Sequence, residues 1–235
     1  MDCLEGMKNL KSNLVDCILT DPPYEIDYNN RSKELAKLGK SSDKQIERDK
    51  SFVDKISSYS ELANEFYRLL KHNSHCFIFC AGSQIGIWQN VMVEAGFKSP
   101  QVLVWKKNRT TFDMTNGYKF PVNNEFLLFF QKGWKKLNGY KISRNRFRSV
   151  LEFKRGDTTF HSCSKPLDLL RFIIKLSTFK EDVVLDGFIG GGSTAVACKE
   201  LGRDFIGFEL SEEYCEVANN RLKQTGLIKW FVKAV

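Results

Sequence analysis

The sequence lacks the marks of several large protein classes. No apolar run approaches the roughly 18 residues of a membrane span, and the chain has no internal repeat or low-complexity tract. The first residues, MDCLEGMKNLK, show neither the apolar stretch nor the small-residue cleavage site of a signal peptide. We therefore expect a cytoplasmic globular protein that binds no membrane, and the fibrous and disordered classes are excluded.

The sequence also lacks a paired-cysteine motif. None of its seven cysteines forms a C-x-x-C pair, and their placement in apolar runs indicates a reducing compartment. Cys76 and Cys80 lie four residues apart, with His72 and His75 just upstream, so a metal site has to be weighed. Because the run is short and aromatic and no second ligand pair exists, we expect a buried strand and no metal.

The composition fits a single folded domain whose charge is uneven. The 235 residues suffice to bury a core without staples, and 36 Lys and Arg against 28 Asp and Glu give a net charge of +8. Residues 131–160 alone contain nine basic and two acidic residues, interleaved with aromatic side chains. Cations neutralise phosphates and aromatic groups contact bases, so this block predicts a nucleic-acid-binding surface rather than a solvated face.

Short apolar runs alternate with segments of helical period along most of the chain. This pattern predicts an α/β fold with a mostly parallel central sheet and helices on both faces. We expect strands at 15–20, 76–80, 101–105, 125–130, 182–186 and 204–209, and helices at 59–72, 83–96, 165–178, 192–202 and 211–224. We expect one domain, 1–235, with functional insertions at 25–57 and 131–160.

Two strand ends carry residues suited to chemistry. The first expected strand ends in Asp21-Pro22-Pro23-Tyr24, which places a carboxylate, rigid carbonyls and an aromatic ring where open α/β sheets bind ligands. The alternative, a proline stop signal, explains the prolines but not the other two residues.

The second strand end opens a glycine turn. Asp186 ends a strand, the glycines at 190–192 lead into a helix at Ser193, and Glu209 ends the next strand. Glycines allow a ligand to approach the backbone, a helix N-terminus attracts anions, and an acidic strand end suits ribose hydroxyls. Because the turn also satisfies G-x-G-x-x-A, it does not by itself distinguish NAD from S-adenosylmethionine.

Taken in order, these motifs resemble the amino-group DNA methyltransferases in which the catalytic motif precedes the cofactor loop. The resemblance also includes Asp2-Cys3-Leu4, Asn124-Glu125 and the segment HSCSKP at 161–166, so it spans nearly the whole chain. It implies a Rossmann-like S-adenosylmethionine-dependent fold. Gly187 departs from the family pattern, which usually has proline there, and is expected to loosen the turn.

The resemblance assigns roles to individual residues. Asp21 and the Pro22 carbonyl would accept the N–H groups of the target amine, and Tyr24 would stack on a base flipped out of the duplex. Pro23 belongs to the same catalytic motif. The implied cofactor-binding residues are Asp2, Cys3, Lys165, Asp186, Phe188, Gly190, Gly191, Gly192, Ser193 and Glu209. Lys165 would pair with the cofactor carboxylate, and Glu209 would hold the ribose.

We therefore expect a site-specific methyltransferase that acts on the N6 amine of adenine in double-stranded DNA. Adenine is preferred because the tetrapeptide begins with Asp, whereas Ser there is more typical of cytosine N4 enzymes. A non-catalytic DNA-binding or cofactor-sensing module is a further alternative. The expected DNA contacts are Lys141, Arg144, Arg146 and Arg148. A cognate restriction endonuclease and a homodimer are partners that remain to be tested.

Overall fold

A computed structural model describes residues 2–23, 59–107, 122–139, 148–154 and 165–224, and every structural statement below concerns these residues. All of them except Pro23 belong to one compact unit. Tyr24 and the expected insertion at 25–57 lie outside the described residues.

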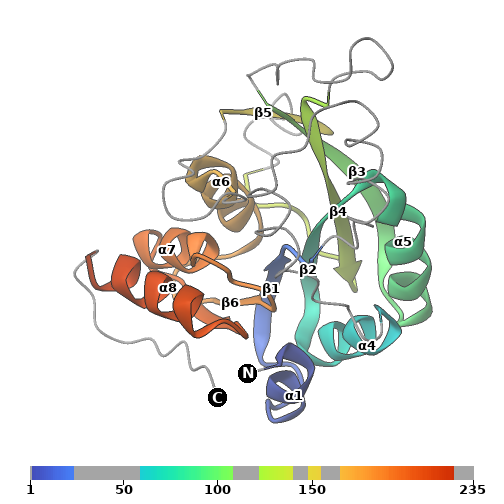
Figure 1. The fold of residues 1–235 in the computed structure, drawn as a ribbon. Coiled ribbons are helices and arrows are strands. Elements are labelled where there is room, and N and C mark those ends of the chain that lie inside the picture. The colour runs from blue at the N-terminus through green and yellow to red at the C-terminus, as the bar shows by residue number, and fades with distance from the viewer. Residues whose placement is uncertain (1, 24–58, 108–121, 140–147, 155–164, 225–235) are drawn as a thin grey trace, which may run out of the picture. The chain divides into compact units, whose positions relative to one another are not determined.

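The described residues form a seven-stranded sheet in the order β5-β3-β4-β2-β1-β6-β7 (Figure 1). The strands are β1 (Val15–Thr20), β2 (Leu70–Cys80), β3 (Lys98–Lys107), β4 (Asn124–Lys132), β5 (Val150–Phe153), β6 (Val183–Asp186) and β7 (Asp204–Gly207). Strand β4 is antiparallel to both neighbours, and every other pair is parallel. The expected mostly parallel sheet is confirmed, with β4 as the reversed strand.

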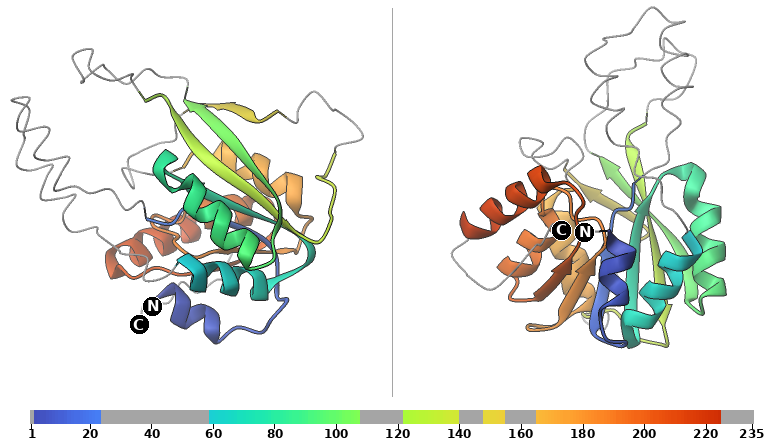
Figure 2. Two further views of the ribbon diagram at one scale, coloured as in Figure 1. Left: turned by 90° about the vertical axis from the view of Figure 1, so that its right-hand side faces the viewer. Right: turned by 60° about the horizontal axis from the view of Figure 1, so that its bottom comes forward.

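Helices cover both faces of this sheet (Figure 2). They are α1 (Cys3–Lys8), α4 (Tyr59–Leu69), the 3-10 helix η1 (Gly82–Gln84), α5 (Ile85–Glu94), α6 (Leu167–Ser177), α7 (Ser193–Glu200) and α8 (Glu212–Gln224). Helices α6, α7 and α8 bury apolar residues against one face, where Phe77, Phe79 and Phe129 project from β2 and β4. Helices α1, α4 and α5 lie together on the other side, as both views of Figure 2 show.

Two elements escaped the sequence analysis. Helix α1 has only six residues, capped by Asp2, whose Oδ1 accepts the N–H of Leu4 at 2.9 Å. Strand β5 has four residues and lies at the sheet edge, inside the interval expected to be a DNA-binding insertion. Both elements are too short to carry a recognisable period, so pairing and capping define them instead.

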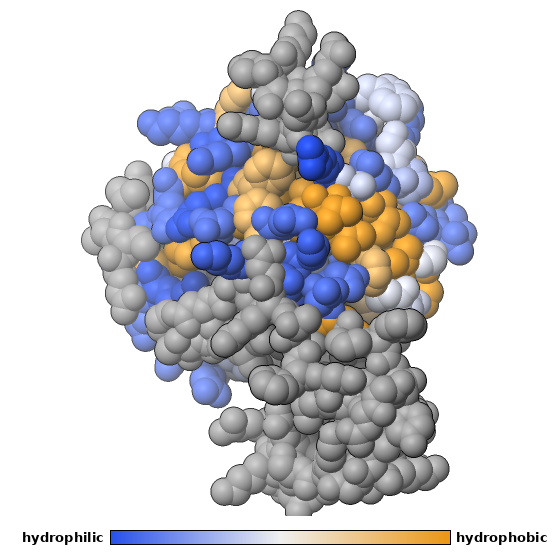
Figure 3. All heavy atoms as spheres, turned by 90° about the horizontal axis from the view of Figure 1, so that it is seen from above, coloured by the Kyte–Doolittle hydropathy of each residue, from blue (hydrophilic) through white to orange (hydrophobic). Residues whose placement is uncertain are grey.

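Because β4 runs opposite to its neighbours, its first residues lie at the edge of the sheet where the neighbouring strands end. Strands β1, β2, β3, β6 and β7 end at the edge where β4 begins, because Phe126 pairs with Cys80 near the end of β2. We call this the carboxyl edge and the opposite one the amino edge. Figure 3 views the molecule from the top of Figure 1, toward which β3 runs, and shows hydrophobic and hydrophilic residues in adjoining patches.

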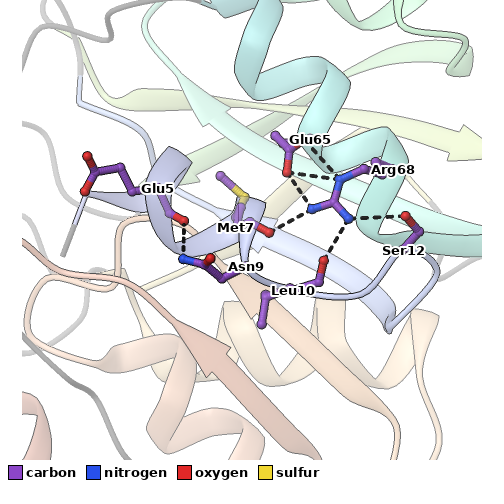
Figure 4. Close-up of polar contacts among 7 residues, drawn as sticks. All are labelled: Glu5, Met7, Asn9, Leu10, Ser12, Glu65 and Arg68. Carbon is purple, nitrogen blue, oxygen red and sulfur yellow. Dashed lines mark hydrogen bonds and ion pairs between the residues drawn. The ribbon is translucent and has the colours of Figure 1, made fainter.

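Helix α1 is fastened to α4 through one guanidinium group (Figure 4). Arg68 donates to the carbonyls of Met7 at 2.7 Å and Leu10 at 2.8 Å, and Glu65 accepts from the same guanidinium at 2.7 Å. These bonds satisfy carbonyls at and just beyond the end of α1, which has no further helical turn to do so.

No helix within the described ranges is long and apolar enough to cross a membrane.

Candidate active site

The predicted catalytic carboxylate lies at the carboxyl edge. Asp21 follows directly on β1, and the two prolines after it cannot continue the ladder, so the chain leaves the sheet there. Pro22 is buried, whereas Asp21 and Pro23 are partly exposed. The site residues Asp21, Pro22 and Pro23 are thus placed where open α/β sheets present functional groups.

Asp21 lies in a chain of alternating charges. Its Oδ2 accepts a hydrogen bond from Lys165 Nζ, and the same ammonium lies 3.4 Å from Glu125 Oε2. Lys107 Nζ, at the end of β3, reaches Glu125 Oε1 at 2.5 Å. Two carboxylates and two ammonium groups from four separate segments therefore meet at this edge.

Lys165 was expected to contact the cofactor carboxylate, and the structure gives it carboxylate partners within the chain. It is only 8% exposed, and its Nζ lies 4.9 Å above the ring of Phe79. Glu125 was noted as part of a motif but was given no role. Its position depends on the reversal of β4, which sequence patterns alone do not show.

The glycine turn after β6 has the backbone geometry that its sequence predicts. Gly190 and Gly192 have positive φ values of 48° and 77°, which favour glycine over residues that carry a side chain. A Cβ on Gly192 would lie 2.8 Å from the Cβ of Ala218, so α8 packs directly against the turn. Glycine is thus required at position 192 on two independent grounds.

An arginine that was not anticipated supports the same turn. Arg221, on α8, donates from Nη1 to the carbonyl of Gly191 and to Ser193 Oγ, the latter at 3.2 Å. It therefore fastens α8 to the first residue of α7. A single arginine within a solvated helix pattern carries no signal that would have revealed this contact.

A buried hydrogen-bond group joins the two functional strand ends. Thr20, the last residue of β1, donates to Asp186 Oδ1 at 2.8 Å and accepts the N–H of Gly187 at 3.1 Å. Phe188 N–H donates to the same Asp186 oxygen at 3.0 Å. Burial raises the pKa of Asp186 to about 6, although these hydrogen bonds act to lower it. Thr20, which directly precedes Asp21, is thus hydrogen-bonded to the start of the glycine turn.

The bond from Gly187 bears on its departure from the family pattern. Proline has no N–H and could not donate to Thr20, so this turn is held by a contact that the usual residue cannot make. A Cβ at this position would meet Thr20 Oγ1 at 3.7 Å, which is ordinary van der Waals contact. The backbone of Gly187 does not require glycine, and the turn is tied rather than loose.

Glu209 is fixed beside the glycine turn. Its Oε2 accepts the N–H of Gly190, and its Oε1 accepts those of Leu210 and Ser211, each at 2.9 Å. The carboxylate therefore lies at the carboxyl edge close to the turn, as predicted. Three backbone donors hold it in one orientation, which suits a carboxylate that has to meet a ligand.

The N-terminal residues approach the same turn from the other side of the sheet. Cys3 is buried, and its Cβ lies 3.9 Å from the point that a Cβ of Gly187 would occupy. Asp2 caps α1 immediately before it. Asp2 and Cys3 are thus near the cofactor loop, and Arg68 holds the far end of the helix that carries them.

The basic block divides into different environments. Lys141, Arg144 and Arg146 lie outside the described residues, whereas Arg148 is exposed and borders an apolar hollow lined by Phe77, Leu103, Phe129 and Phe172. Lys132 donates to the carbonyls of Tyr67 and Leu70, and Lys135 donates to that of Ser177. These two lysines stabilise the amino edge, so part of the block's charge has a structural use.

The run at 74–80 is buried, which includes the strand expected at 76–80 and its two cysteines, whereas His72 is exposed. Cys76 and Cys80 are buried on one face of β2, and His75 points to the other face, toward Ser177 on α6. Across the described segments, no group of three or more His, Cys, Asp or Glu side chains could hold a metal ion.

Comparison with solved structures agrees with this geometry. The complex of M1.HpyAVI with S-adenosylmethionine superposes with a TM-score of 0.70 at 28% identity, covering 94% of this chain and 96% of that chain. The cytosine-N4-specific PvuII methyltransferase has the same fold, with a TM-score of 0.73 at 16% identity over 97% of this chain and 86% of its own. Fold and site define the class of Rossmann-like S-adenosylmethionine-dependent methyltransferases.

Sequence comparison narrows the class. A family model described as DNA methylase, covering N6 and N4 enzymes, matches residues 15–220. The type II methyltransferase M2.DpnII of Streptococcus pneumoniae is 30% identical over 245 residues, covering 94% of this chain and 87% of the relative. M.HindIII of Haemophilus influenzae is 29% identical over 288 residues, covering 94% and 93%. The chain therefore belongs to the N6/N4 amino-group DNA methylase family.

Proposed function

We propose that the protein transfers a methyl group from S-adenosylmethionine to the N6 amine of adenine in double-stranded DNA, at a specific site. The observation that carries this proposal is Asp21, a carboxylate at the end of β1 that Lys165 holds beside the glycine turn. The type II names of the relatives support sequence-specific action on DNA.

The residues present fit the cofactor. Glu209 is oriented toward the turn and suits ribose hydroxyls, while Gly190, Gly191, Gly192 and Ser193 form a close-approach backbone at the N-terminus of α7. Such a terminus attracts an anionic group such as a carboxylate. Asp186 and Phe188 shape the start of the turn, and Asp2 and Cys3 lie beside it. When bound, S-adenosylmethionine supplies an electrophilic methyl on a sulfonium.

The remaining chemistry is assigned to Asp21 and its neighbours. An exocyclic amine is a poor nucleophile because its lone pair is delocalised into the ring. Asp21 and the Pro22 carbonyl would accept its N–H groups and thereby concentrate the lone pair on nitrogen. Tyr24 and Pro23 complete this motif, with Tyr24 stacking on the flipped base.

Cytosine N4 is the second candidate target. The likeness to the PvuII enzyme supports only the fold, and the family includes both specificities. Asp rather than Ser at position 21 favours adenine. A non-catalytic module is disfavoured because Asp21, Glu209 and the glycine turn, to which the proposed reaction is assigned, are each held by hydrogen bonds.

The partners proposed are double-stranded DNA, a cognate restriction endonuclease and a second copy of this chain. Family membership supports DNA as the substrate, and the type II names of the relatives support a cognate restriction endonuclease. A cytoplasmic location is proposed as well, because genomic DNA, the proposed substrate, lies there. Size-exclusion chromatography with light scattering tests the homodimer.

One experiment separates the candidate functions. The purified protein is incubated with methyl-labelled S-adenosylmethionine and DNA, the DNA is hydrolysed to nucleosides, and the labelled base is identified. We expect label in N6-methyladenine. Label in N4-methylcytosine would show that the target is cytosine N4 instead of adenine N6. Absence of label across DNA of diverse sequence would favour the non-catalytic module.

A further inference from the structure

The charge chain at the carboxyl edge contains one group with no role in the proposed reaction. Glu125 begins the reversed strand β4, and its Oε1 is held by Lys107 at 2.5 Å. Its Oε2 is buried and, among the described atoms, has no hydrogen-bond partner. Lys165 Nζ lies 3.4 Å from that oxygen, which is an ion-pair distance but not a good hydrogen bond.

Lys165 is the link between Glu125 and Asp21. Its ammonium donates to Asp21 Oδ2 and also lies over the ring of Phe79, which restricts its movement. An ammonium attracts carboxylates as a compact point charge, so two carboxylates on either side share one cation. We propose that Glu125 and Lys165 are positioning residues that set the orientation of Asp21. This inference rests on the proposed function of Asp21.

The contacts of Lys165 support this assignment. Its ammonium donates to Asp21 Oδ2, which fixes where that carboxylate oxygen lies, and the same ammonium lies 3.4 Å from Glu125 Oε2. Glu125 therefore helps to fix the ammonium that orients Asp21. Burial acts to raise the pKa of Glu125, but Lys165 and Lys107 outweigh it and hold the value below the usual range. Glu125 thus stays charged.

The sequence-derived role for Lys165 makes a different prediction. If Lys165 serves chiefly to bind the cofactor carboxylate, its loss weakens cofactor affinity and leaves the rate of the saturated complex intact. If it positions Asp21, its loss leaves cofactor affinity intact and slows the methyl-transfer step. Binding and single-turnover measurements on the same variants therefore distinguish the two roles.

The test uses Lys165→Met, Lys165→Arg and Glu125→Gln in the full-length protein. The matched control is Glu152→Gln, which breaks an exposed pair between Lys106 and Glu152 at 3.0 Å on neighbouring strands. We expect Lys165→Met to slow single-turnover methyl transfer about 100-fold and Glu125→Gln about 10-fold. Cofactor affinity, measured by calorimetry, should remain within about twofold, Lys165→Arg should recover part of the rate, and the control should match wild type.

A second readout does not require activity. The chemical shift of the Asp21 carboxyl carbon, measured by NMR at neutral pH, should change in Lys165→Met and in Glu125→Gln, because each variant alters the contacts that orient this carboxylate. It should match wild type in the Glu152→Gln control.

The contrary results are equally definite. A loss of cofactor affinity of tenfold or more with an unchanged single-turnover rate would overturn the positioning role. So would an Asp21 carboxyl chemical shift that is the same in wild type and in both variants. The wild-type labelling experiment tests the methyltransferase function separately, because the NMR comparison keeps its meaning whichever base is labelled.

Discussion

The two edges of the sheet use positive charge in opposite ways. At the carboxyl edge, Lys165 and Lys107 face the carboxylates of Asp21 and Glu125. At the amino edge, Lys132 and Lys135 face backbone carbonyls. Asp21 and Glu125 are also bonded to lysine, but they stand at the edge where open α/β sheets bind ligands. We therefore propose that the first edge serves binding and chemistry, whereas the second serves stability.

Two buried titratable groups lie near opposite edges of the sheet. Asp186, near the carboxyl edge, has its pKa raised by burial to about 6. His75, toward the amino edge, has its pKa lowered by burial to about 4. Its Nε2 lies 3.0 Å from the carbonyl of Lys135 and therefore has to donate, so Nδ1 accepts from Ser177 in the neutral ring. Each group favours its uncharged form.

The largest expected effect separates chemistry from stability. Asp21→Ala should reduce the single-turnover rate by about 100- to 1,000-fold, since one preorganised polar contact to the reacting amine is lost. Thermal stability should change little, because Asp21 is partly exposed and lies outside the core. Rapid-quench measurement on labelled DNA gives the rate. A variant within a few-fold of wild type would remove Asp21 from the catalytic role.

The second prediction concerns the opposite pH responses of the two edges. Folded Asp186 retains a proton that the unfolded chain releases between about pH 4 and 6, so its contribution to unfolding free energy falls as pH rises through that window. Folded His75 binds no proton between about pH 4 and 6.5 where the unfolded chain does, so its contribution is lost as pH falls through that window. Each effect is up to about 3 kcal/mol.

Urea denaturation at several pH values checks this for wild type, Asp186→Asn and His75→Gln. The stability difference between wild type and Asp186→Asn should decrease from pH 4 to 6. The difference between wild type and His75→Gln should increase from pH 4 to 6.5. Parallel curves for all three proteins would show that neither group titrates as its burial implies.

The third prediction concerns the amino edge alone. Lys132→Met should lower the free energy of unfolding by about 2 kcal/mol, because the carbonyls of Tyr67 and Leu70 lose their bond to the ammonium. Methyl transfer per folded molecule should be unchanged. The control is Lys136→Met at an exposed position of the same block. Equal stability of the two variants would contradict the structural role of Lys132.

Local patterns predicted the parts of the site that one segment builds. The Asp21 strand end, the glycine turn and Glu209 each follow from a strand, its terminus and the next few residues, and the structure places them together at the carboxyl edge. Parallel strands bring such ends to one edge whatever their distance along the chain. This explains why so much of the site was visible in the sequence.

The remaining parts depend on register and on backbone partners, which the sequence does not display. Glu125 reaches Lys165 because β4 runs backwards, and Arg221 reaches Gly191 because α8 packs on Gly192. Counting charge assigned Lys132 and Lys135 to a DNA-facing block, although carbonyls already bind them. Composition gives the sign of a segment's net charge, but only the fold shows which of its charged side chains already bond within the protein.

The smallest expected effect tests which charges of the block reach DNA. Arg148 is exposed just before β5, whose first residue Val150 pairs with Val104 of β3, and Lys136 is exposed beyond the end of β4 at the amino edge. The pair therefore compares a basic residue beside the sheet with one at its amino edge. Arg148→Ala should reduce the slope of log affinity against log salt by about 1, as expected for one lost phosphate contact. Lys136→Ala should leave the slope unchanged, because the amino edge faces away from the end of β1. If Arg148 reads a base instead, the slope stays constant and preference at one position relaxes, which competition with variant duplexes would reveal. Equal loss of slope in both variants would mean that DNA contacts extend to the amino edge, and the division between the two edges would then hold for catalysis and stability but not for binding.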